Sequence, residues 1–147
     1  MTLIKVDNQR HALSVLAKSV LIVALSGPAV GAEAVSDSDL SRICRATIAA
    51  IMGRDVDIIS TTSVSDGVAR NEYRRPGDNS VWKNQCKVDG NRVIWAGIDV
   101  DGPGSGPGRW RDDPLDEVIT YELLGDAVQI VETYSDGSAT VTNVEVK

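Results

Sequence analysis

The chain has 147 residues, with 15 basic and 21 acidic side chains and a formal net charge of −6 at pH 7. Nucleic-acid binding depends on Lys and Arg side chains that neutralise phosphates, so this acidic balance argues against a nucleic-acid partner. The length suits one domain with one hydrophobic core.

The first 32 residues are organised like a secretory signal peptide. Basic residues precede a short apolar run at 20–25, and a Gly-Pro pair and small residues follow it. The run is far shorter than the ~20 apolar residues that a membrane-spanning helix needs. We therefore expect cleavage after Ala32 or after Ala34, export to a periplasmic or extracellular compartment, and no membrane anchor on the cleaved protein.

Loss of residues 1–32 would remove the only histidine, His11, and leave 115 residues with a net charge of −8. Ser-His-Asp and Cys-His nucleophilic systems require imidazole as a base, and many zinc and copper sites require it as a ligand. The sequence therefore predicts one non-catalytic domain over residues 33–147, and it indicates neither a cofactor nor a metal.

The two cysteines, Cys44 and Cys86, favour a single structural disulfide, because exported proteins fold under oxidising conditions. A catalytic redox pair would be expected in a Cys-x-x-Cys motif, which the sequence lacks. The predicted bond closes a loop of about 42 residues, long enough to constrain the unfolded chain strongly.

An amphipathic helix is predicted over residues 38–52. Its apolar residues recur with the spacing of one helical face, and Cys44 lies among them. Ser36 or Ser38 is placed to cap the helix and Gly53 to end it. A bond to Cys86 would lay this helix across the strand that carries the second cysteine.

Turn residues then separate short runs of β-favouring residues. The expected strands are 56–62, 68–75, 80–88, 92–99, 117–124, 127–134 and 138–146. Tight turns make sequence neighbours pair in space. The predicted fold class is α+β, with one N-terminal amphipathic helix packed on a meandering antiparallel β-sheet of about six to seven strands.

Residues 80–97 form the clearest hairpin. A two-residue Asp89-Gly90 turn would place Cys86 opposite Val93, on a core face that also carries Trp82 and Trp95. These two tryptophans are then expected to be diagonal neighbours beneath the helix.

The two C-terminal hairpins are expected to differ in the length of their turns. Gly125-Asp126 is predicted to form a two-residue turn. For the last turn we favour a three-residue loop over 135–137 to a two-residue Asp136-Gly137 turn, because it places Val144 and Val146 beside Val128.

A long Gly/Pro-rich loop, residues 101–114, carries the first candidate binding site. It contains Arg109, Trp110 and Arg111, and Arg and Trp dominate binding hot spots. The alternative is a connector whose Trp110 folds back onto the sheet and whose arginines are neutralised by neighbouring aspartates.

The second candidate site is a basic strand face. Lys83, Lys87 and Arg92 share the hairpin face opposite the tryptophans and could meet an acidic partner. Ordinary solvation of a sheet face is the alternative. Ile94 and Ala96 on the same face suggest that the loop, a partner or a second copy covers part of it.

Carboxylates offer two further possibilities. An irregular calcium site could use Asp99, Asp101, Asp112 and Asp113, although no EF-hand spacing is present. A hydrolase would need two carboxyls across a cleft. The candidates for that pair are Glu117, Glu122, Glu132 and Glu145.

These patterns favour a small exported, non-catalytic binding module. In the first hypothesis it is an interaction or inhibitor-like domain that presents Arg109, Trp110 and Arg111, or the basic strand face, to another envelope protein or macromolecule. In the alternative it carries or senses a small ligand held between helix and sheet near Trp82, Trp95 and Tyr121.

Overall fold

The computed structural model describes residues 34–147; the predicted signal peptide and the cleavage site after Ala32 lie outside them. One helix, one 3-10 turn and seven strands follow in chain order. They are α1 (Asp37–Met52), η1 (Val56–Ile58), β1 (Ile59–Ser65), β2 (Val68–Arg74), β3 (Val81–Asp89), β4 (Arg92–Ile98), β5 (Val118–Leu124), β6 (Ala127–Thr133) and β7 (Ala139–Glu145). The strands form one antiparallel sheet in the order β1 to β7, which confirms the α+β meander.

Helix α1 has the predicted caps. The Oγ of Ser36 accepts a hydrogen bond from the backbone N–H of Asp39 at 3.1 Å, and Gly53 ends the helix in the left-handed region at φ 58°. The apolar face of the helix, including Ile43, Cys44 and Ile48, is completely buried against the sheet.

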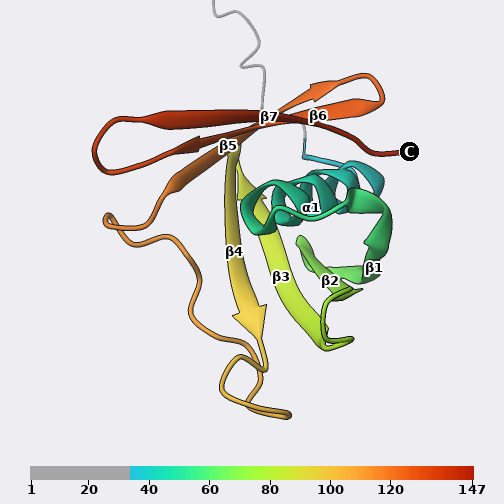
Figure 1. Cartoon of the computed structure of the whole chain (residues 1–147). Coiled ribbons are helices and arrows are strands. Elements are labelled where there is room, and N and C mark those ends of the chain that lie inside the picture. Colours follow the sequence, from blue (N-terminus) through green and yellow to red (C-terminus); the bar gives the residue numbers. More distant parts are fainter. Residues whose placement is uncertain (1–33) are drawn as a thin grey trace, which may run out of the picture. The chain divides into compact units, whose positions relative to one another are not determined.

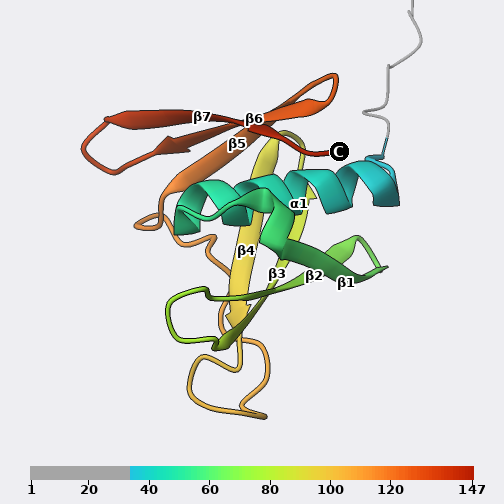
Figure 2. The same cartoon turned by 45° about the vertical axis from the view of Figure 1, so that its right-hand side comes forward.

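The sheet is strongly bent, and α1 lies in the bend. Figures 1 and 2 show β5, β6 and β7 crossing the upper end of β3 and β4, with α1 in the angle between the two halves of the sheet and β1 and β2 below it. The bend occurs where β4 and β5 pair through only Arg92↔Thr120 and Val93↔Ile119. We call the side of the sheet that faces α1 the inner face, and the opposite side the outer face.

Two arginines connect α1 to both edges of this sheet. Arg45 donates hydrogen bonds to the carbonyls of Ile59, at 2.8 Å, and Val56, at 3.2 Å, where β1 begins. Arg42 donates to the carbonyls of Val146, at 3.3 Å, and Gly125, beside β6 and β7. The helix therefore links the first strand to the last hairpin.

The predicted disulfide is present. Cys44 on α1 is bonded to Cys86 on β3, their Cα atoms are 5.7 Å apart, and both residues are fully buried. A disulfide is typical of proteins that fold outside the cytoplasm.

The predicted turn of the central hairpin is wrong by one residue. The turn is Gly90-Asn91, so Cys86 faces Trp95 rather than Val93. Gly90 has φ 58° and Asn91 does not have a positive φ, which is the type II′ pattern with glycine first. The predicted faces survive, because moving the turn by one residue changes the pairing by two residues, which leaves each side chain on its original side.

The position predicted for Trp82 is also wrong. This residue pairs with Tyr73 on β2, with the ring centroids 6.4 Å apart, and it is 39% exposed. Trp95 lies opposite Cys86, so the two tryptophans are not diagonal neighbours. Trp82 stacks on its β2 neighbour instead of packing beneath the helix.

The registers of the two C-terminal hairpins are as predicted, whereas the first strand differs. Leu124 faces Ala127 across the Gly125-Asp126 turn, and Val128 faces Val144 as the three-residue loop requires. The first expected strand starts three residues late, because Asp55 caps the 3-10 turn η1.

Removal of the disulfide should destabilise the domain strongly. A double variant, Cys44→Ala with Cys86→Ala, should lose about 4 kcal/mol of unfolding free energy. The disulfide joins residues 42 positions apart, and without it the unfolded chain gains conformational entropy. Urea unfolding followed by tryptophan fluorescence measures this loss. A loss below about 1 kcal/mol would show that the bond does not hold α1 in place.

Candidate functional site

The long loop after β4 returns alongside that strand. Its backbone N–H groups at Gly108 and Arg111 donate to the carbonyls of Gly97 and Trp95, each at 2.8 Å. Figure 1 shows the loop passing beyond the end of β4 and coming back beside it. The loop thus occupies the part of the β4 edge that β5 leaves unpaired.

Trp110 in this loop packs on the outer face. The Nζ of Lys87 lies 4.5 Å from the centroid of the Trp110 ring, a cation–π distance. Ile94 faces Lys87 across the β3–β4 ladder and is buried, although its side chain is on the outer face. Part of the predicted basic face is therefore covered by the loop.

An ion pair fixes the end of the loop. Arg109 donates to both carboxylate oxygens of Asp116, at 2.6 and 2.7 Å, and the backbone N–H of Asp113 donates to the same carboxylate at 3.0 Å. The hydrogen bond from Arg109 is the main reason that the pKa of Asp116 falls to about 2. The same contact raises the pKa of Arg109.

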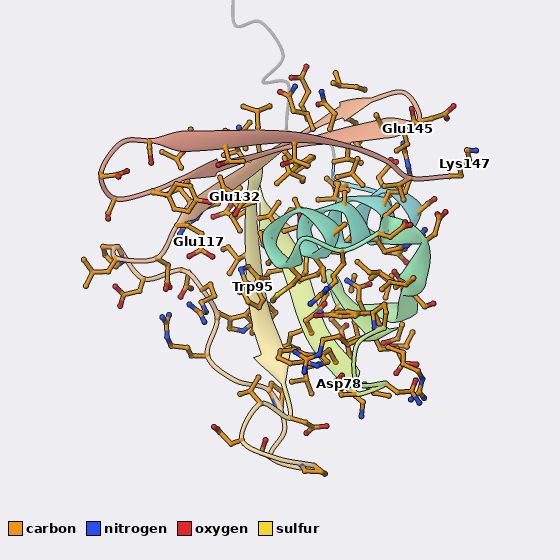
Figure 3. The ribbon with its side chains drawn as sticks, in the orientation of Figure 1. Asp78, Trp95, Glu117, Glu132, Glu145 and Lys147 are labelled. Atoms are coloured by element: carbon orange, nitrogen blue, oxygen red, sulfur yellow. A yellow bond between two sulfur atoms is a disulfide. The ribbon has the colours of Figure 1, made fainter. Side chains whose placement is uncertain are left out.

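A pocket of about 460 Å³ lies where α1 ends and the loop returns. Three parts of the structure enclose it: the end of α1, the inner face of β2 to β4, and the loop wall. Residues that line it include Met52, Trp82, Asn84, Trp95, Arg109 and Arg111. Figure 3 labels Trp95 on β4. The lining is mostly apolar, with a few polar and charged groups, as ligand pockets usually are.

The side chain of Val100 packs against Gly97 at the loop wall of the pocket. A Cβ atom added to Gly97 would lie 2.5 Å from the Cγ1 of Val100, so a larger residue at 97 would displace the Val100 side chain. Both residues line the pocket. The shape of the pocket therefore depends on a glycine in β4.

Positively charged residues outnumber negatively charged ones in the lining of the pocket. Lys83, Arg109 and Arg111 line it, whereas Asp99 is its single acidic lining residue. Asp99 accepts from the N–H of Gly106 at 2.9 Å and from Lys83 at 3.4 Å, and the first of these bonds is the main cause of its lowered pKa. The only carboxylate at the pocket is thus already engaged.

The structure brings together half of the binding residues predicted from sequence. Lys83, Arg109 and Arg111 line one pocket. Lys87 stacks with Trp110 on the outer face. Arg92 lies at the β4–β5 junction, opposite Thr120, and is not part of the pocket lining.

Asn84 is a polar lining residue that was not predicted from the sequence. It is only 2% exposed and lies on the inner face, where apolar residues were expected. The signal was present, because a polar residue at an inward position of an alternating strand needs a partner. Its role depends on the loop and on the helix end, which the strand pattern does not show.

The other predicted carboxylate sites do not assemble into a metal cluster. Within residues 34–147, no three His, Cys, Asp or Glu side chains are grouped so that they could hold a metal ion. Glu132 is buried on the inner face, while Glu145 is at the other end of the β6–β7 ladder, as Figure 3 shows.

Comparison with protein-family models, curated proteins and solved structures finds no match to this chain. Among residues 34–147, no helix has both the length and the apolar character needed to cross a membrane. A functional conclusion must therefore come from the chemistry of the pocket and its surroundings.

Replacement of Trp110 should test how firmly the loop is packed. Trp110→Ala should lower Tm by roughly 4 °C or more, because it removes the ring that covers Lys87. The control Leu115→Ala removes an almost fully exposed side chain of the same loop and should shift Tm by less than about 2 °C. Equal, small shifts would identify Trp110 as a free surface residue.

The Arg109–Asp116 pair should contribute pH-dependent stability. The pKa of Asp116 is lowered from 3.8 to about 2, so its stabilisation is complete above pH 3.8 and disappears as the pH falls through 2. The Tm difference between wild type and Asp116→Asn should be largest at neutral pH and should shrink across that interval. Asp101→Asn, which changes an exposed loop carboxylate, should show no such trend. A constant difference for Asp116→Asn would contradict the role of the ion pair.

Proposed function

We propose that this chain is an exported, non-catalytic binding module that carries or senses a small ligand in the pocket beside Trp95. The observation that carries the proposal is the pocket itself. Its volume of about 460 Å³ falls in the range of small-molecule sites, roughly 300–1,000 Å³. Its lining combines aromatic surface with a small number of polar groups, the usual composition of such sites.

Two features support export. The N-terminal 32 residues have the pattern of a cleavable signal peptide. The only two cysteines of the chain form a buried bond between α1 and β3. Such bonds persist in oxidising compartments.

The polar groups at the pocket support binding rather than catalysis. They are the Asn84 amide, the Tyr73 hydroxyl, the indole N–H groups of Trp82 and Trp95, one ammonium and two guanidinium groups, with Asp99 already bonded to Lys83 and Gly106. Residues 34–147 contain no histidine. No side chain in this set is a nucleophile activated by an adjacent base.

A small ligand is better supported than a macromolecular partner. The loop is joined to β4 by backbone hydrogen bonds, and Trp110 packs on Lys87 instead of projecting from a tip. A concave, partly aromatic cavity suits a compact molecule. The interaction-module hypothesis, with Arg109, Trp110 and Arg111 or the basic strand face as its contact surface, stays a prediction.

Binding of a neutral aromatic probe tests the proposed function. N-phenyl-1-naphthylamine should bind the purified protein with increased fluorescence, and Val100→Trp should weaken binding at least tenfold by filling the pocket. Val141→Trp is the matched control, because Val100 and Val141 are 63% and 59% exposed but Val141 lies on β7. Absence of probe binding to wild type, or equal affinity in both variants, would overturn the proposal.

A further inference from the structure

We propose that the ligand of this pocket is an organic anion, with an apolar body and one carboxylate group. The inference rests on the proposed binding function and identifies the class of ligand. It follows from the polar atoms at the pocket, which are unpaired donors on the inner face and cations around them.

A buried chain of hydrogen bonds leads from α1 to the pocket. The Oγ1 of Thr61 donates to the Oδ1 of Asn71 at 2.7 Å and is bonded to the Oγ of Ser41, also at 2.7 Å. Because the Thr61 proton goes to Asn71, Ser41 must be the donor to Thr61. The oxygen of Asn71 is thereby used, and its Nδ2 is left buried without a partner.

Asn84 stands directly beside this free donor. It is the cross-strand partner of Asn71, and its own Oδ1 is buried without a hydrogen bond. A hydrogen bond from the Asn71 Nδ2 to the Asn84 Oδ1 would satisfy both buried atoms. The polar atom left for Asn84 to offer the pocket that it lines is then Nδ2, which is a donor.

Trp95 supplies a second donor on the same face. It is 9% exposed, and its Nε1–H is buried without a partner. An indole nitrogen donates and does not accept, and a buried unpaired donor is costly. An acceptor group of a ligand would relieve that cost at Trp95, and it would also suit the Nδ2 donor of Asn84.

Arg111 adds a positive charge beside these donors. Its guanidinium lies 5.3 Å from the Trp95 ring centroid, and its contact with Asp116, at 3.7 Å, is much longer than the contacts that Arg109 makes. Asp116 is thus mainly occupied by Arg109, which leaves Arg111 available. Guanidinium groups bind carboxylates through two parallel hydrogen bonds.

A cationic ligand would find no free carboxylate in the described pocket lining. Asp99, the only lining carboxylate, is bonded to Lys83 and to the Gly106 N–H. The apolar part of the lining, which includes Met52 and Trp82, suits the body of the ligand. A carboxylate on an apolar, preferably flat, molecule matches both halves of the pocket.

A competition experiment tests this inference. 2-Naphthoate and its neutral analogue 2-naphthamide, which have the same ring body, are used to displace bound N-phenyl-1-naphthylamine. In wild type, 2-naphthoate should displace the probe at a concentration about tenfold lower than 2-naphthamide does, because charged hydrogen bonds are the stronger ones.

Two variants locate the origin of that preference. Arg111→Met removes the charge, and Asn84→Asp replaces the donor with an anion of the same shape; each should abolish the preference. Retained affinity for the neutral probe shows that a variant is folded and that its pocket is intact. Arg70→Met, on the exposed outer face of β2, is the matched loss of charge and should keep the preference.

The outcomes separate the two proposals. Equal displacement by naphthoate and naphthamide in wild type would overturn the anion inference while leaving the binding pocket supported by the probe. A preference that persists in both Arg111→Met and Asn84→Asp would overturn the assignment to these residues. Failure of the probe itself to bind would remove the proposed function on which the inference rests.

Discussion

The attachment of α1 to β3 through Cys44 and Cys86 is the constraint on which the rest of the structure depends. The bond fixes where the helix crosses the sheet. From that position Arg42 and Arg45 reach carbonyl groups at opposite ends of the meander, near β7 and β1. A sheet of seven strands in linear order has no closure of its own, and the helix supplies the contact between its two ends.

The pocket exists because the helix and β5 cover only part of the length of β3 and β4. The helix ends at Gly53, and β5 leaves β4 after two residue pairs, but β3 and β4 continue beyond both. Their inner face would be open to solvent there, and the returning loop forms a wall that makes it a partly open pocket. The strand that holds Cys86 in the core also carries Asn84 to the pocket, so one strand contributes to both the core and the pocket lining.

The sequence was most informative about which side of the sheet each residue faces. A change of two residues in the pairing of a hairpin keeps each side chain on the same side of the sheet. The inner positions predicted for Cys86 and Trp95 were therefore correct, although their predicted partners were not. Trp82 was misplaced because periodicity says nothing about how far the helix extends along a strand. The pocket joins residues from the helix end, three strands and a loop, and that convergence has no signature in local spacing.

The position of the loop in the chain has an evolutionary consequence. Elsewhere the meander uses short turns whose length sets the strand register, so insertions there would disturb the core. Residues 99–117 join two strands that barely pair, and doubling the length of a flexible loop costs only about 0.6 kcal/mol. The wall of the pocket is therefore the part of this scaffold that selection could lengthen, shorten or rewrite most freely. Relatives of this domain could change the shape of the pocket at that segment while keeping the disulfide-anchored framework unchanged.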